Sequence, residues 1–428
     1  MTRPFKTSRP SLALAGMAAS AALLPLTAQA TNGYFSHGYG AKAQGIAGVG
    51  IALPQDALAA ATNPAGIAAV GDRTDLGLTW FAPSREASIT GNAFGPDATH
   101  SGNGKKNFFI PDFGITRQIS PQLSWGVAVY GNGGMNTDYG TNPFGRFGAT
   151  GSAGVNLEQL FISPSVAYKW NDAHTVGVAL NVAHQRFSAK GLGLFSAFSG
   201  APGNVSDQGT DTSTDAGVRL GWTGKVTPRL TLGATWASKV SGKFDKYKGL
   251  FADGGGFDVP ENYGLGLAFE LSPDTTLAAD VQTIRYSKVH SVGNSVASLF
   301  GGSPLGSANG PGFGWRDQTV LKVGVQHKAS KDLTLRAGFS AANQVVKPGE
   351  TFFNTVAPGV VRRHVTLGFT LATQGGGEWS GFYALGLGER VNGSGSIPPG
   401  FPPGGLGGGN ANVRLKEHIV GISYAWTY

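Results

Sequence analysis

The sequence predicts an all-β fold, namely a transmembrane antiparallel β-barrel of about fourteen strands with an N-terminal hatch (plug) inside its lumen. Three observations predict this fold. Glycine makes up 68 of 428 residues, more than twice its average usage, and only 14% of residues are charged. Apolar and polar residues alternate over runs of about nine to fifteen residues. Short turns and long glycine-rich connections follow each other along the chain.

The first thirty residues predict a cleaved signal peptide. The start is positively charged, residues 12–26 form a short apolar run, and Ala28-Gln29-Ala30 resembles a cleavage site. The apolar run is shorter than the ~20 residues that a membrane-spanning helix needs. We therefore expect an exported mature chain that begins at Thr31.

Residues 31–72 do not alternate, and we expect them to form the hatch. The segment is rich in Gly and Ala, and it contains Phe35, Asp56 and the tripeptide Asn63-Pro64-Ala65. Residues 56–61 predict a helix that Pro64 ends, because proline disfavours helical backbone in the residue before it. A disordered periplasmic tail is the alternative, although the segment is apolar rather than charged.

Residues 73–428 carry the alternation that predicts strands with two distinct faces. In the run 262–271, for example, Tyr263, Leu265, Leu267 and Phe269 alternate with small or polar residues. A soluble sandwich would bury such a face in strands of about 5–6 residues, whereas a membrane barrel turns it toward lipid in longer segments. The first strand contains Pro83, which predicts a kink or two separate strands.

Long connections alternate with short turns, which places the long loops on the outer side of the membrane. The last strand ends in Trp426 and Tyr428, consistent with an aromatic girdle. We expect the long loops near residues 135–153, 189–212, 244–257, 291–314, 344–361 and 392–411.

The N-terminal pattern resembles the FadL-like (OmpP1/TodX) family of outer-membrane transporters for long-chain fatty acids and hydrophobic compounds. The pattern Gly45-x-Ala47-Gly48-x-Gly50-x-Ala52 precedes Asp56 and Asn63-Pro64-Ala65, which is similar to the family's Asn-Pro-Ala signature. The segment around Pro83 looks like the family's first, proline-containing strand.

The resemblance implies a monomeric fourteen-strand barrel in the bacterial outer membrane, in contact with lipid and lipopolysaccharide. Its ligand would be a fatty acid or an aromatic hydrocarbon, taken up passively and without a cofactor. Asn63 and Pro64 would fix the hatch. A kink in the third strand would let the ligand leave sideways, and Gly131-Asn132-Gly133-Gly134 fits such a break. A plain flexible turn is the alternative at these four residues.

Apolar residues recur in the long loops and predict a surface that captures the ligand. The candidates are Leu194, Phe195, Phe198, Leu250 and Phe251. Exposed apolar patches usually mark binding sites. Loops that pack only against themselves are the alternative.

A carboxylate ligand would need a cation near the pocket, and the candidates are Arg186, Arg285 and Lys288. Arg186 occupies a place similar to a pocket arginine of the family. Strict alternation, however, puts Arg186 on the lipid-facing side unless a bulge reverses the phase. Basic residues facing solvent or lipopolysaccharide are the alternative for all three.

Other function classes find less support. The chain has no Cys, no Gly-x-Ser-x-Gly elbow and no His-Glu-x-x-His motif, so we expect no enzyme, although a Ser/His pair from distant strands stays open. The net charge of +8 without a Lys/Arg run predicts no nucleic-acid partner. A general porin for polar solutes, and an adhesin or phage receptor that uses the loops, are the alternative functions.

Overall fold

The computed structural model describes residues 32–400 and 405–428. The expected signal peptide lies outside these residues.

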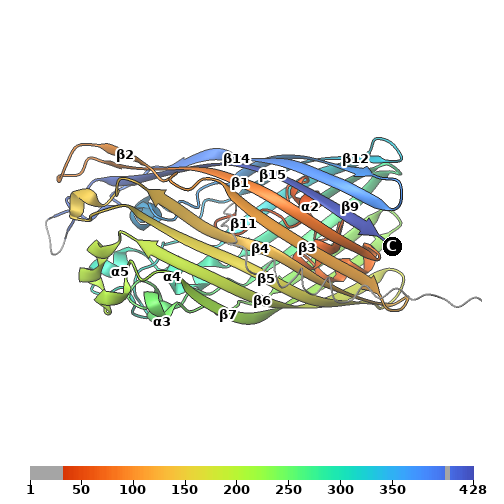
Figure 1. Cartoon of the computed structure of the whole chain (residues 1–428), viewed down its shortest axis with the longest axis horizontal. Helices are drawn as coiled ribbons and strands as arrows, with labels where there is room; N and C mark the ends of the chain where they lie inside the picture. The colour runs from red at the N-terminus through yellow and green to blue at the C-terminus, as the bar shows by residue number, and fades with distance from the viewer. Residues whose placement is uncertain (1–31, 401–404) are drawn as a thin grey trace, which may run out of the picture.

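The described chain forms one antiparallel sheet in which fourteen strands follow each other in sequence order, and β15 pairs with β1 to close the barrel (Figure 1). β2 is an additional short strand on β1. The strands are β1 (Arg73–Thr90), β2 (Ala98–Ser101), β3 (Phe108–Gln118), β4 (Leu123–Tyr139), β5 (Ala153–Lys169), β6 (His174–Lys190), β7 (Asp211–Thr227), β8 (Leu230–Ala237), β9 (Asn262–Ser272), β10 (Thr275–Ile284), β11 (Gln318–Lys328), β12 (Leu333–Ala342), β13 (Arg363–Ala372), β14 (Gly377–Val391) and β15 (Asn410–Thr427).

The apolar face of the strands points outward, as the alternation predicts. On β9, Leu265 is 62% exposed and Leu267 is 41% exposed, whereas Ala268 between Leu267 and Phe269 is buried. Adjacent strands repeat the pattern, so that apolar side chains form a belt around the barrel. Such a belt is stable in lipid, because closure pairs the backbone groups and leaves no sheet edge in hydrocarbon. The predicted barrel is confirmed.

The long loops lie at one end of the barrel and the short turns at the other. β8 to β13 have only 8 to 11 residues, while β4 to β7 have 17 each. The long loops fold over the mouth of the barrel. Their short helices are η3 (Gly145–Phe147), η4 (Gly193–Phe198), η5 (Pro202–Asn204), η6 (Asp245–Tyr247), α3 (Ala252–Gly255), η7 (Tyr286–Lys288), α4 (His290–Gly293), α5 (Ala297–Phe300), η8 (Pro348–Glu350) and α6 (Thr351–Asn354).

Two expectations about the loops and the first strand need correction. The chain has a seventh long connection, residues 91–107, which was not predicted and which contains β2. β4 continues to Tyr139, so residues 135–139 belong to this strand and not to the loop predicted at residues 135–153. β1 is one strand of 18 residues, paired with β15 along its whole length in spite of Pro83. Pro83 lies beyond Phe81, the last β1 residue that pairs with β3, so its missing N–H interrupts no bond on that side.

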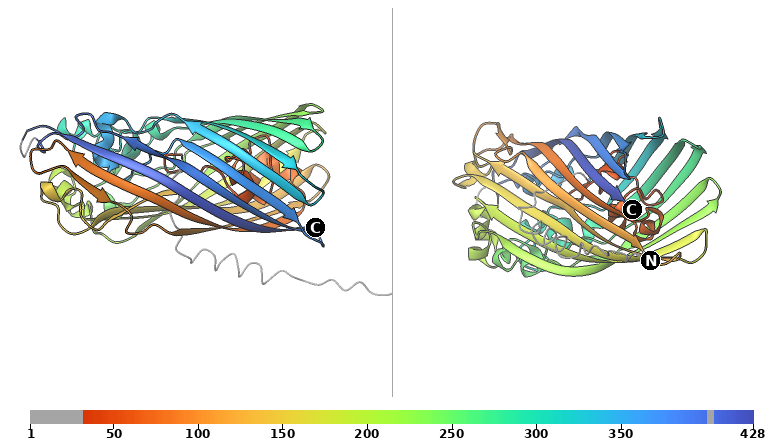
Figure 2. Two further views of the ribbon diagram at one scale, coloured as in Figure 1. Left: turned by 90° about the horizontal axis from the view of Figure 1, so that it is seen from above. Right: turned by 45° about the vertical axis from the view of Figure 1, so that its right-hand side comes forward.

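Residues 32–72 run inside the barrel, toward the end of the short turns (red in Figures 1 and 2). They form α2 (Ala41–Gln44), η1 (Ala57–Ala61) and η2 (Pro64–Ala69). The predicted helix over 56–61 is a single 3-10 turn capped by the Asp56 side chain, which accepts from Leu58 N at 3.0 Å. Pro64 does not merely end it but begins η2, where a missing N–H costs nothing. Among the described residues, no helix is long and apolar enough to cross a membrane.

The outward belt makes a testable prediction. Leu367, 59% exposed in the middle of β13, should tolerate no charge, so Leu367→Arg should lower the free energy of unfolding by about 2–4 kcal/mol. Reversible folding into lipid bilayers measures this change. Asp274→Arg, in an exposed short turn, is the control and should change the same quantity little. Equal effects of the two substitutions would contradict the orientation of the belt.

Candidate functional site

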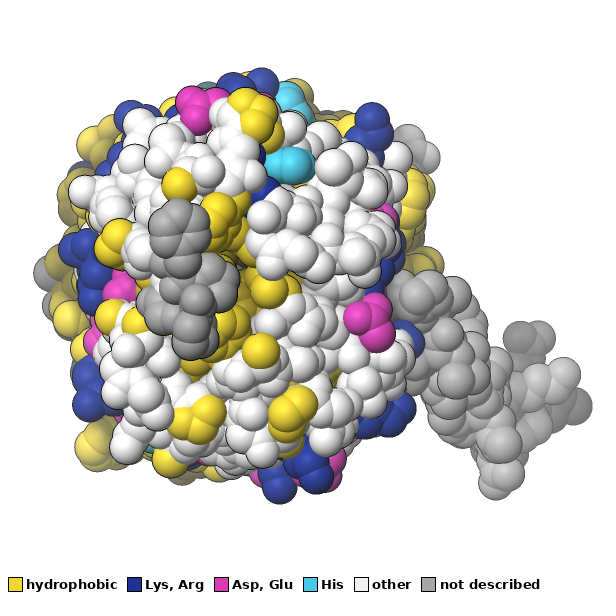
Figure 3. All heavy atoms as spheres, turned by 90° about the vertical axis from the view of Figure 1, so that its left-hand side faces the viewer, with side chains coloured by type: hydrophobic (Ala, Val, Ile, Leu, Met, Phe, Trp, Pro, Cys, Tyr) yellow, Lys and Arg dark blue, Asp and Glu magenta, His cyan; other side chains and the backbone are white. Residues whose placement is uncertain are grey.

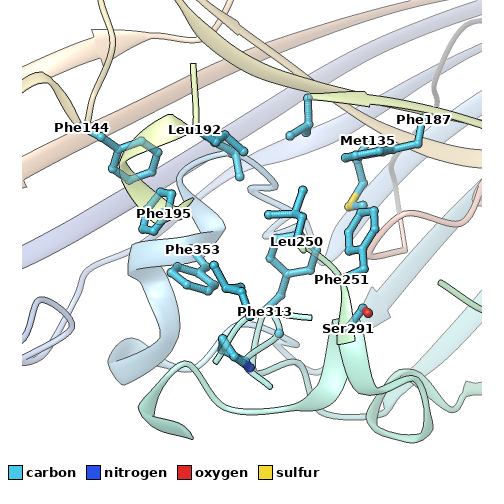
Figure 4. Close-up of a pocket in the computed structure, with 15 residues that line it drawn as sticks. Met135, Phe144, Phe187, Leu192, Phe195, Leu250, Phe251, Ser291, Phe313 and Phe353 are labelled. Atoms are coloured by element: carbon cyan, nitrogen blue, oxygen red, sulfur yellow. The ribbon is translucent and has the colours of Figure 1, made fainter. Parts of the chain in front are cut away.

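An apolar cavity, here called the outer pocket, lies at the loop end of the barrel. In Figure 3 hydrophobic side chains gather in a furrow in the middle of this end, and Figure 4 shows the side chains of the pocket pointing toward one another. The lining residues come from β4, β5, β6 and five loops. They are Met135, Phe144, Val155, Phe187, Leu192, Phe195, Leu250, Phe251, Ser291, Leu305, Pro311, Gly312, Phe313, Phe353 and Val356.

Aromatic rings give the outer pocket its walls. Phe195 packs edge-on against Phe144 and Phe353, with ring centroids 5.1 Å and 5.3 Å apart, and Phe187 meets Phe251 at 4.7 Å. Edge-to-face pairs of this kind are favourable and fix ring orientation. The cavity measures about 50 Å³, less than a hydrocarbon ligand needs. A ligand must therefore push flexible side chains such as Met135 and Leu250 aside.

Three of the five predicted loop residues line the outer pocket: Phe195, Leu250 and Phe251. Leu194 and Phe198 are partly buried against the same hydrophobic cluster without lining the pocket. Sequence reasoning missed Phe187, although alternation along β6 places it inward together with the buried Gln185. It also missed Phe144, Phe313 and Phe353. Each lies in a different long loop, where no periodic pattern in the sequence indicates which side chains face the pocket.

The structure places none of the three candidate cations on the outer pocket. Arg186 points to the outer face of β6 and forms an ion pair with Glu158 at 3.6 Å. Arg285 pairs with Asp317 at 2.8 Å, and Lys288 is exposed at the end of η7. The only polar side chain of the lining is Ser291, whose hydroxyl donates to the Gly256 carbonyl. The outer pocket thus offers no charge to a ligand.

The lumen-filling segment is held by charged side chains of the wall. Asp280 of β10 accepts from Gly50 N at 2.8 Å and from Ile51 N at 3.1 Å, while Lys322 of β11 donates to the His37 carbonyl at 3.0 Å. Lys42 forms an ion pair with Glu378 of β14. Hydrogen bonds to charged groups are stronger than those between neutral groups. The segment is therefore fixed from several strands at once.

Asn63, Pro64 and Ala65 lie against β6 and β7. The Asn63 amide donates to the Ile51 carbonyl at 2.8 Å and to the Trp222 carbonyl at 3.0 Å, and its oxygen accepts from Ala65 N at 3.1 Å. A Cβ atom at Gly221 of β7 would lie 1.9 Å from the Asn63 side-chain oxygen. Glycine on the inner face thus permits the close approach that this anchor needs.

The pairing between β3 and β4 is interrupted, and we call this stretch the wall gap. β3 pairs with β4 only up to Val129, opposite Phe113, and a bridge between Asn103 and Asp138 lies farther along. Within the described chain, no strand pairing joins residues 108–112 of β3 to residues 130–136 of β4. The predicted break Gly131–Gly134 lies in this stretch.

A bulge in β4 lies at the wall gap. Gly131 pairs with Leu160 of β5 and Gly133 with Gln159, so Asn132 is an extra residue. The bulge reverses the phase of the strand. Tyr130 faces inward before it, and Met135 after it. Because of this reversal, Met135 reaches the outer pocket.

The start of the lumen-filling segment takes the place that β3 leaves. Gly134 N donates to the Tyr34 carbonyl at 2.8 Å, and Ser36 N donates to the Asn132 carbonyl at 2.9 Å. Phe35 between them is buried and packs edge-on against Tyr286 at 5.9 Å. Burial raises the pKa of the Tyr34 and Tyr286 hydroxyls well above the ordinary value, so both stay uncharged.

A second cavity, here called the inner cavity, lies behind the wall gap. Its lining residues come from β1, β4, β15 and two other segments: Gly33, Phe81, Pro83, Arg85, Gly134, Met135, Asn136, Ala357, Pro358, Gly359, Leu415 and Glu417. Met135 lines both cavities and therefore lies between them. The arrangement is an apolar pocket at the loop end, a methionine shared by both cavities, and a second cavity next to the stretch where β3 and β4 do not pair.

Comparison with known proteins identifies the family. The profile of the outer membrane protein transport protein family (OMPP1/FadL/TodX) matches residues 18–374. Among curated proteins no sequence matches significantly. The resemblance in the N-terminal motif is therefore confirmed by the family profile.

Solved structures share the fold at low sequence identity. The Pseudomonas putida toluene transporter TodX has a TM-score of 0.66 and 19% identity over 92% of this chain and 99% of its own. A Pseudomonas aeruginosa FadL homologue has a TM-score of 0.70 and 17% identity, again over 92% and 99%. The Ralstonia pickettii toluene transporter TbuX has a TM-score of 0.63 and 17% identity over 92% of this chain and 99% of its own.

The Asn63 anchor makes a testable prediction. Asn63→Asp keeps the acceptor for Ala65 N but removes both donors, so the Ile51 and Trp222 carbonyls lose their partner. Loss of both hydrogen bonds, with the buried Ile51 carbonyl left unpaired, should lower the opening free energy of residues 51–66 by about 2–4 kcal/mol. Hydrogen–deuterium exchange of these residues should accelerate accordingly.

Asn92 provides a matched control in the loops. Its amide donates to the Leu406 and Gly408 carbonyls, and its oxygen accepts from Phe94 N, which repeats the arrangement of Asn63. Asn92→Asp should leave exchange of residues 51–66 unchanged. Unaltered exchange in Asn63→Asp would show that Asn63 does not anchor the segment.

Proposed function

The chain belongs to the outer membrane protein transport protein family (OMPP1/FadL/TodX), and from this premise we propose how hydrophobic small molecules pass through it. The family consists of outer-membrane transport channels rather than enzymes. In our proposal the outer pocket captures the ligand, Met135 moves aside, and the ligand reaches the inner cavity. It then leaves sideways through the wall gap into the bilayer, without cofactor or energy input.

One observation carries this proposal: Met135 lines both an apolar pocket and a cavity beside the stretch where β3 and β4 do not pair. The free energy of an apolar molecule rises by about 0.8 kcal/mol for each CH₂ group that it returns to water. A lateral route into lipid avoids this rise, whereas a straight path to the periplasm would require it. Residues 31–72 act in this proposal as the hatch that closes the straight path.

The outer pocket favours an uncharged ligand, and we propose an uncharged aromatic compound rather than a fatty acid. Burial of a carboxylate is costly unless a cation or several donors pair with it. The lining offers only the Ser291 hydroxyl, which is already bonded to Gly256. TodX and TbuX, whose barrels resemble this one, are toluene transporters.

The role of Met135 is testable by enlarging its side chain. Met135→Trp should lower the rate of toluene uptake by cells at least tenfold, because the larger ring blocks the passage. The affinity of toluene for the purified barrel should fall much less. Uptake of labelled toluene and calorimetric titration measure the two quantities. Val155→Trp, which narrows the outer pocket alone, is the control and should lower uptake and affinity together. A similar response of the two variants would exclude a route past Met135.

The hatch is testable by its effect on ion current. The intact protein should be nearly silent in planar bilayers, because residues 32–72 fill the lumen, and deletion of residues 31–72 should open a steady current. Single-channel recording measures both. A large steady current from the intact protein would support the alternative of a general porin and contradict the hatch.

A further inference from the structure

Glu417 is a carboxyl group that the proposed route does not explain. It lies on β15 opposite Pro83 of β1, is fully buried and lines the inner cavity. Among the described residues, neither of its oxygens has a hydrogen-bond partner, and His364 Nε2 stands 3.6 Å from Oε2. An unpaired buried carboxyl is costly. Ionisable groups inside membrane proteins commonly mark the path of a substrate.

Arg85 faces the same cavity from β1. One terminal nitrogen donates to the carbonyl and side-chain oxygens of Asn136, at 2.6 Å and 2.7 Å, and the other donates to the Lys105 carbonyl. Its Nε has no hydrogen-bond partner in the described part of the chain. The guanidinium is thus held in place, and one donor remains for a ligand.

The inner cavity therefore combines an acceptor, a donor and apolar walls. Glu417 supplies the acceptor in either protonation state, Arg85 supplies the donor, and Phe81, Pro83 and Leu415 supply the walls. The cavity measures about 20 Å³, which is room for a hydroxyl group or a water molecule but not for a ring. Any ring attached to that hydroxyl must lie toward Met135 or the wall gap.

We propose that Glu417 and Arg85 bind the hydroxyl group of a hydrophobic compound, a phenol or an alcohol, as it passes the inner cavity. The inference rests on the proposed route. A hydroxyl group donates to Glu417 and accepts from Arg85 Nε at once, and neither a hydrocarbon nor a carboxylate satisfies both. The channel therefore takes hydroxylated hydrophobic compounds in preference to hydrocarbons of the same shape.

Two ligands of equal shape test this preference: 4-ethylphenol, and 4-ethyltoluene, in which a methyl group replaces the hydroxyl. Titration calorimetry of the full-length barrel in detergent gives both dissociation constants. Glu417→Leu should weaken 4-ethylphenol about tenfold and change 4-ethyltoluene less than twofold. Glu417→Gln should keep most of the preference, because its amide oxygen still accepts.

Asp75→Asn is the control, since Asp75 is another buried carboxyl, is paired with Arg73 and lines neither cavity. It should leave the ratio of the two constants unchanged. If Glu417→Leu does not fold, Arg85→Lys carries the test, because lysine keeps the charge but lacks the Nε donor, and the preference should again fall.

The outcomes separate the two proposals. Binding of both ligands with an unchanged ratio in Glu417→Leu and in Arg85→Lys would overturn the hydroxyl site and leave the route intact. Failure of both ligands to bind the unaltered protein would overturn the proposed route and the hydroxyl site together.

Discussion

The backbone of a membrane barrel must be hydrogen-bonded throughout, because hydrocarbon offers no other partner. Along β4 two different partners meet this requirement. β3 pairs with it up to Val129, and residues 34–36 pair with it around the bulge at Asn132. The segment that fills the lumen is thus also part of the wall. Any displacement of residues 34–36 leaves backbone groups of β4 unpaired, so the wall gap and the lumen-filling segment respond to each other.

The same segment explains why the inner face of the barrel carries small residues and why several charged residues there are paired. Gly221 allows Asn63 to approach β7, and Asp280 and Glu378 meet backbone or side-chain donors of the segment. Buried charges stabilise a fold little in net terms, but removing one partner is strongly destabilising. The charges therefore specify where the segment sits more than they add to stability.

Much of this architecture is readable from the sequence, because a strand with lipid on one side and a packed lumen on the other must alternate. Alternation predicted the barrel, its outward faces and the position of Arg186 on the outer side of β6. The resemblance to the family suggested a pocket position for the same residue. The bulge at Asn132 adds one residue to β4, and no periodicity predicts where the phase reverses. The outer pocket depends on that reversal at Met135 and on loops that meet only in the folded chain.

The small volumes of the outer pocket and the inner cavity affect how strongly a passive channel can hold its ligand. A route conducts only if each site binds well enough to admit the ligand and weakly enough to release it. A rigid, preformed apolar pocket would hold its ligand. Here the outer pocket measures about 50 Å³, so part of the burial energy is spent on displacing Met135 and its neighbours. Methionine suits this position because its unbranched side chain has three rotatable bonds. The bilayer beside the wall gap requires no such displacement, so in the proposed route the free energy of an apolar ligand would fall toward the membrane.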